Sequence, residues 1–155
     1  MSNNDHAISA NINSSFQELT AAAVDLNQAS DELAKSVSEL DAALKALNLG
    51  IECWVEVGSS SAAGGSVSWT DELGFAKVSG KWGLALRTLH VREGNSDDEA
   101  AYWLFNEASR DMRIEAVEFL PALLRALTES AVLKKDQLRT RLDSVRRLTA
   151  TEDGW

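Results

Sequence analysis

The residue types that carry most enzyme chemistry are scarce in this sequence. It contains two histidines, His6 and His90, and a single cysteine, Cys53. It has no His-Glu-x-x-His, Cys-x-x-Cys or Gly-x-Ser-x-Gly string and no P-loop signature, so a zinc site, a nucleophile elbow and a phosphate-binding loop are not indicated. We therefore expect a protein that is not an enzyme and that holds neither a metal nor a cofactor.

Tryptophan and basic side chains form a pattern that suits the binding of a small ligand. Four of the five tryptophans lie between residues 51 and 105. An indole that stacks on a flat group beside a cation is a common arrangement for binding a base or another planar anion. The candidate contact or ligand surface consists of Trp54, Trp82, Arg87, Lys77 and Lys81. Alternatively, the indoles fill a thin core that few other bulky residues occupy, and the sequence leaves both interpretations open.

The clearest pattern in the chain is a row of apolar residues at alternating steps of four and three. It begins at Ile12, and every seventh residue from Leu19 to Leu47 is a leucine. This heptad spacing predicts a helix that is buried along one straight seam, with each leucine stabilising it by roughly 1.5 to 3 kcal/mol as an upper estimate. The candidate interaction seam consists of Phe16, Leu19, Leu26, Leu33, Val37, Leu40, Leu44 and Leu47.

Local signals place this helix at residues 15–48, after a flexible tail over residues 1–14, with a start as early as Ile8 as the alternative. Ser15 and Glu18 form a capping box, and Gly50 provides a stop. Such a helix is about 50 Å long, so it must protrude or be covered by another helix. The residues beside the seam are mostly small, whereas a parallel two-stranded zipper usually has Glu and Lys there, so we favour a bundle or an antiparallel contact.

The middle of the sequence changes to the period of two that is typical of strands. Residues 51–57 alternate as a half-buried strand, and the glycine- and serine-rich stretch 58–66 is predicted to be a flexible connection. Residues 69–78 and 81–91 then form a hairpin around Ser79-Gly80, with Val78 opposite Lys81. One face near this turn carries only Gly and Ala, so we expect both faces of the sheet to be covered. Residues 100–105 favour a fourth strand over a short helix.

The last part of the chain is predicted to be helical over residues 107–149, before a tail at 150–155. Asn106 is the expected N-cap, and Pro121 predicts a kink or a break near residues 117–121. The stretch 134–147 carries six basic and two acidic residues, so it can lie beside the acidic first helix. Exposed ion pairs of this kind contribute only about 0 to 1 kcal/mol each, so they tune the register of a stalk that the leucines stabilise.

These elements predict an α+β protein with a single domain over residues 15–149. The long N-terminal helix and the kinked C-terminal helices pack as a bundle-like stalk, with an antiparallel sheet of three or four strands (residues 51–105) between them in sequence. The formal charge of −9 opposes nucleic acid and anionic lipid as partners. The chain lacks an apolar run long enough to span a membrane, and its lone cysteine cannot form an internal disulfide, which favours the cytoplasm.

Three functions are compatible with this pattern. The leading hypothesis is a non-enzymatic protein–protein interaction module: an oligomeric adaptor, inhibitor or accessory subunit that binds a protein partner or itself. The first alternative is a sensor or sequestering protein that binds a small ligand or nucleotide at the tryptophan-rich sheet. The second alternative is an acidic decoy that inhibits a nucleic-acid-binding protein.

Overall fold

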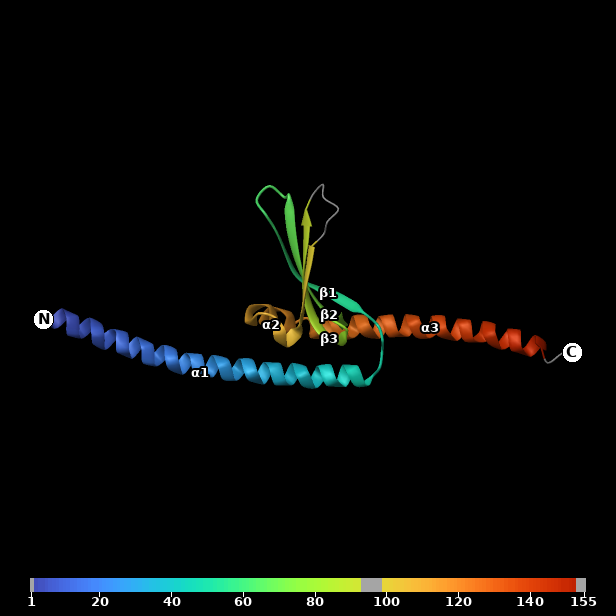
Figure 1. Ribbon diagram of the computed structural model, residues 1–155, viewed down its shortest axis with the longest axis horizontal. Coiled ribbons are helices and arrows are strands. Elements are labelled where there is room, and N and C mark those ends of the chain that lie inside the picture. The colour runs from blue at the N-terminus through green and yellow to red at the C-terminus, as the bar shows by residue number, and fades with distance from the viewer. Residues whose placement is uncertain (1, 93–98, 153–155) are drawn as a thin grey trace. The chain divides into compact units, whose positions relative to one another are not determined.

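The computed structural model describes residues 2–92 and 99–152, and its helices flank a four-stranded antiparallel sheet in the sequence (Figure 1). The α+β class is therefore confirmed. The elements in chain order are α1 (Asn3–Ala46), β1 (Cys53–Ser61), β2 (Val67–Val78), β3 (Lys81–Arg92), β4 (Glu99–Leu104), the 3-10 helix η1 (Phe105–Glu107), α2 (Arg110–Val117) and α3 (Leu120–Glu152). The chain divides into two compact units, Met1–Leu40 and Asp41–Trp155. The single domain over residues 15–149 stays a prediction.

Helix α1 begins twelve residues before the predicted start. Residues 3–14 are helical, so the prediction of a flexible tail over residues 1–14 is wrong for them. This segment contains no Gly or Pro, and Asp5 in the first turn interacts favourably with the helix dipole. The predicted capping box at Ser15 therefore lies inside the helix. The C-terminal end agrees with the prediction to within two residues, because Asn48 and Gly50 adopt left-handed conformations (φ 51° and 61°) just after it.

The central hairpin has the predicted register. Val78 pairs with Lys81, and the remaining pairs follow down to Val67 with Arg92. Positive φ angles at Ser79 (50°) and Gly80 (83°) are those of a two-residue turn whose twist matches the flanking strands. The predicted fourth strand is also confirmed for residues 100–104, whereas residue 105 already belongs to η1.

Strand β1 is longer than predicted, because residues 58–61 pair with β2. The prediction that residues 58–66 form a flexible connection is therefore wrong for these four residues, and only 62–66 connect the strands. The register shifts between Glu56 and Gly58, so Val57 is an extra residue in β1. This bulge reverses which side chains face each side of the sheet beyond it.

The sheet has one bulky face and one nearly bare face. Leu73, Phe75, Leu84 and Leu86 project from the bulky face and are buried. Helix α3 contacts β1 and β2 (Figure 1), and Met112 and Ala116 of α2 line a small cavity with Leu86. Leu123 and Leu127 of α3 are also buried, so the main core lies between this face and the two C-terminal helices.

The bare face carries Gly74, Ala76, Gly83 and Ala85, all of them buried. A side chain added at Gly74 would overlap the Trp54 indole, and one at Gly83 would lie 3.2 Å from Oδ1 of Asp41. The Trp54 ring and the last turns of α1 therefore cover this face. The expected covering of both faces is found, and the small residues are what permits the close approach.

The C-terminal helices are separated at the predicted proline. Helix α2 ends at Val117 and α3 begins at Leu120, so Pro121 lies in the first turn of α3, where its missing N–H costs nothing. The predicted N-cap Asn106 is wrong: Ser109 caps α2, and its Oγ accepts a hydrogen bond from the Met112 N–H (3.3 Å). Helix α3 extends to Glu152, so residues 150–152 are not part of a C-terminal tail, and residues 153–155 lie outside the described part.

Candidate interaction surfaces

The predicted interaction seam on α1 is exposed over its first half. Val37 and Leu44 are 3% and 5% exposed, whereas Phe16 and Leu19 are 66% and 61% exposed. Leu33 and Leu40 have intermediate exposure, and Leu26 and Leu47 are exposed. The expectation that the whole row is hidden is therefore wrong for a single chain. Heptad spacing specifies which face of a helix is apolar, but it does not specify that the same chain covers that face.

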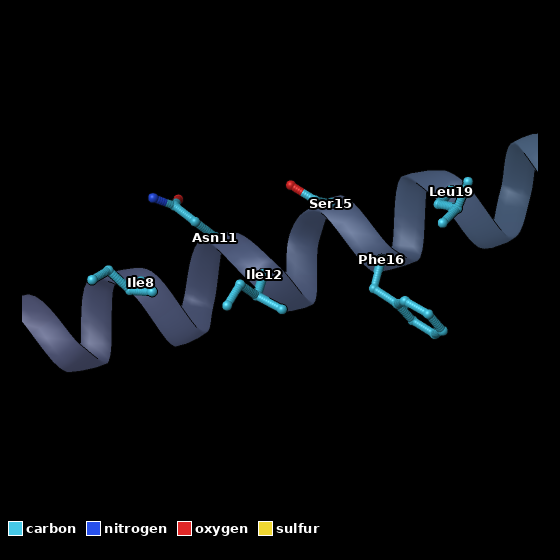
Figure 2. A pocket seen from close by; sticks show the side chains of 6 residues that line it. All are labelled: Ile8, Asn11, Ile12, Ser15, Phe16 and Leu19. Carbon is cyan, nitrogen blue, oxygen red and sulfur yellow. The ribbon is translucent and has the colours of Figure 1, made fainter.

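The exposed half of the seam forms one continuous face that starts before Ile12. Figure 2 shows Ile8, Asn11, Ile12, Ser15, Phe16 and Leu19 on successive turns of α1, with the Ile12 and Phe16 side chains on the same side. Every one of these lining residues belongs to the same helix, so they form an open surface and not an enclosed cavity. Such a surface suits another helix better than a small molecule, which usually binds in a concave site.

Thr20 lies beside this face, and its polar group is already hydrogen-bonded within the helix. The Thr20 hydroxyl donates to the Phe16 carbonyl oxygen one turn earlier (2.8 Å). Covering this hydroxyl would therefore leave no unsatisfied donor. A helix of this length with an apolar stripe open to water gains most of its stability from packing against something, because intrinsic propensity alone is marginal. The stripe therefore has the properties of an interface.

An acidic row follows the seam, and it was missed when only the positions immediately flanking the heptad core were considered. Glu18, Asp25, Glu32 and Glu39 each precede a seam leucine, at intervals of seven residues. They therefore lie along one side of α1. The first Lys or Arg in the chain is Lys35, so the exposed half of α1 carries acidic charge without either of these cations. The interval of seven was the signal that identified this row.

A second exposed apolar surface lies on the C-terminal half of α3. This part of the helix continues beyond the sheet (Figure 1), and its exposed apolar residues are Val132, Leu133, Leu138, Leu142, Val145 and Leu148. Next to it, a groove of about 360 Å³ is lined mainly by leucines from the end of α1, the following turn and α3, including Leu47, Leu124 and Val132. The apolar track therefore continues from this groove along α3.

The structure brings together two of the five predicted ligand-surface residues. The Arg87 guanidinium lies 4.1 Å from the centre of the Trp54 ring, and Tyr102 packs edge-on against the same indole at 6.0 Å. Arg87 also forms an ion pair with Glu72 (3.0 Å). The Trp54 Nε1–H donates to Glu52 (2.8 Å). The Arg87 guanidinium and the Trp54 indole thus already interact with each other and with carboxylates of the same chain.

The other predicted ligand-surface residues do not join this cluster. Lys77 pairs with Trp82 on the bulky side of the sheet, where the Trp82 ring stacks on Phe75 at 5.5 Å. Lys81 is on the same side of the sheet as Arg87 but lies at the hairpin turn, six residue pairs away. The five residues therefore do not form one surface, because alternation along β2 and β3 sends them to opposite faces.

Cys53 and His90 are engaged in packing, whereas His6 is exposed on α1. Cys53 Sγ lies 4.0 Å from Ser130 Oγ, and His90 packs edge-on against Trp69 at 5.9 Å. Within residues 2–92 and 99–152, His, Cys, Asp and Glu side chains do not gather in groups of three that could hold a metal ion. Over the same ranges, the helices do not combine the length and apolar character needed to cross a membrane.

Comparison with known proteins gives no further assignment: no family model, no curated protein and no solved structure matches the chain. The arrangement of exposed and buried residues is therefore the basis for inferring function.

Proposed function

We propose that this chain is a non-enzymatic interaction module that assembles with itself through helical, coiled-coil-like contacts, as an oligomeric adaptor or accessory subunit. The observation that carries the proposal is the exposed half of the α1 seam. Ile12, Phe16 and Leu19 are 61–66% exposed on the same heptad row that is buried at Val37 and Leu44. A cytoplasmic setting is part of the proposal, and the single cysteine supports it.

The free energy available from the exposed part of α1 favours an assembly with more than one contact. Burying Ile12, Phe16, Leu19 and Leu26, four exposed residues in the first half of the heptad row, contributes at most about 6 to 12 kcal/mol. Association itself costs an estimated 4 to 15 kcal/mol in lost freedom, so one such contact is marginal. The exposed apolar residues of α3 supply the additional area that a stable assembly needs.

Binding of a planar anion at the sheet has less support than self-assembly. Arg87 is paired with Glu72 and packs on Trp54, so a ligand would have to compete with contacts that already exist. A nucleotide panel tests this alternative. A raised melting temperature and a change in tryptophan fluorescence at saturating nucleotide would favour ligand binding over self-assembly.

Light scattering coupled to size-exclusion chromatography tests the proposal. We expect a mass of at least twice the 16.8 kDa of one chain at high concentration. Apolar contacts survive salt that screens exposed charges, so the mass should persist at about 1 M salt, where the screening length falls to about 3 Å. A single-chain mass at every concentration would contradict the proposal. Assembly that appears only with a basic partner and disappears in salt would favour the acidic decoy.

A further inference from the structure

We propose that the exposed half of α1 binds the C-terminal half of α3 from a second copy of the chain. The α1 stripe is defined as Ile8, Ile12, Phe16, Leu19 and Leu26, and the α3 stripe as Leu138, Leu142, Val145 and Leu148. This inference rests on the proposed function and specifies which surface of the second copy is bound. Both stripes are exposed in the single chain.

The α3 stripe is shorter than the α1 stripe and can be covered by it completely. At a rise of 1.5 Å per residue, the α1 stripe from Ile8 to Leu26 is about 27 Å long, and the α3 stripe from Leu138 to Leu148 is about 15 Å long. Side-by-side packing of the two helices would cover the whole α3 stripe and about half of the α1 stripe.

The two stripes also carry opposite charge. The α1 helix has no Lys or Arg before Lys35, whereas residues 132–148 carry six basic residues and two acidic ones, a net charge of +4. Pairing α1 with another α1 would align acidic rows, and pairing α3 with another α3 would align basic residues. Opposite charges select the right partner surface even where each exposed pair contributes little free energy. Charge therefore favours pairing α1 with α3.

The spacing of the charges agrees with this pairing. Glu18 and Asp25 each precede a leucine of the α1 stripe and are seven residues apart. Arg139 and Arg146 each follow an apolar residue of the α3 stripe, and they are also seven residues apart. All four side chains are exposed. One register of the two helices can therefore bring both arginines next to both carboxylates.

The proposed pair is reciprocal. In such a symmetric pair, α1 of each copy covers α3 of the other, so two equivalent contacts would form for a single loss of translational freedom. A one-sided contact would leave one α1 stripe and one α3 stripe uncovered.

Charge reversal in the full-length chain tests the inference. One variant carries Glu18→Lys and Asp25→Lys, and the other carries Arg139→Glu and Arg146→Glu. Each variant alone brings like charges together, so we expect its dissociation constant for self-association to rise at least tenfold. An equimolar mixture restores opposite charges in both contacts and should assemble as tightly as the original chain. A Glu107→Lys, Asp111→Lys variant reverses two exposed acids outside both stripes and should assemble normally.

Native mass spectrometry of the mixture distinguishes the outcomes, with circular dichroism confirming that each variant is folded. Heterodimers in the mixture but few homodimers of either variant would support the inference. Normal self-association of both variants would overturn it while leaving the proposed function standing. Dissociation of both variants without rescue in the mixture would also overturn it. An original chain that stays monomeric would contradict the proposed function itself.

Discussion

At the scale of single residues, Trp54 determines how the bare face of the sheet is covered. Its indole lies over Gly74, stacks with the Arg87 guanidinium and donates to Glu52. A residue that the sequence marks as a contact candidate is thus largely engaged within its own chain. The predicted hairpin register already placed Arg87 and Trp82 on opposite faces, so part of the ligand-surface hypothesis could have been corrected from the sequence. The contact between Trp54 and Arg87 could not have been predicted from the sequence, because it depends on how β1 aligns with β2.

Gly74→Ala tests the packing of this indole. The added methyl would overlap the Trp54 ring and lie 2.7 Å from the Cys53 carbonyl oxygen. We expect the free energy of unfolding to fall by about 1 to 3 kcal/mol in urea denaturation. Gly58→Ala in the same sheet is the matched control, since nothing lies within 4 Å of its added methyl, and its effect should stay within about 0.5 kcal/mol. Equal stability of the two variants would contradict the described packing.

Asp41→Ala tests how the last turns of α1 are attached to the sheet. Oδ1 of Asp41 accepts a hydrogen bond from the Leu84 N–H (2.7 Å). Leu84 lies in β3 just beyond the end of its pairing with β4, which stops at Ala85 and Leu104. Removing the acceptor leaves this amide unsatisfied, so we expect a loss of about 1 to 3 kcal/mol in the free energy of unfolding.

Asp41→Asn is the control for this hydrogen bond, because its side-chain oxygen still accepts from the amide. It loses the ion pair with Lys45. Because the Lys45 side chain is half-exposed, this ion pair contributes at most about 1 kcal/mol. Urea denaturation should therefore place the asparagine variant close to the original chain. An asparagine variant as unstable as the alanine variant would show that charge, and not the hydrogen bond, is what matters.

At the scale of elements, the hairpin and the break at Pro121 were predictable, whereas the start of α1 and the cap of α2 were not. Turn chemistry and the proline ring act locally through sterics, so the sequence determines their effects directly. The capping box at Ser15 is only a local preference, and continued helix formation through Ile8 outweighs it. The turn of 3-10 helix at Phe105–Glu107 moves the cap of α2 from Asn106 to Ser109.

Leu19→Asp tests the role of the exposed α1 seam. The side chain is 61% exposed in the single chain, so the helix content and melting temperature of the monomer should change little. In the assembly, the charge would be buried without a partner, at a cost of about 3 kcal/mol or more, which weakens association by at least a hundredfold. Sedimentation velocity measures this effect.

Gln17→Asp is the matched control, because it adds the same charge to an exposed position that is not part of the seam. It should assemble like the original chain. Equal loss of assembly in both variants would attribute the effect to net charge, and normal assembly of Leu19→Asp would exclude the seam as an interface.

At the scale of the whole molecule, acidic and basic charge are separated along the chain. The first 34 residues carry acids without Lys or Arg, and residues 132–148 carry net positive charge. Both regions expose apolar stripes, while the buried core lies around the sheet. The sequence predicted an apolar seam and an acidic helix but could not show which part of the seam a single chain covers, because periodicity contains no information on the covering surface.

Hydrogen–deuterium exchange of the α1 amides over residues 8–26, measured across a dilution series, tests whether the exposed seam is an interface. Covering by a second copy protects these amides at high concentration, and dilution below the dissociation constant removes that protection. Amides of the buried strands β2 and β3 serve as the internal reference, since their protection should not depend on concentration. Rapid exchange over residues 8–26 at every concentration would contradict self-assembly through α1.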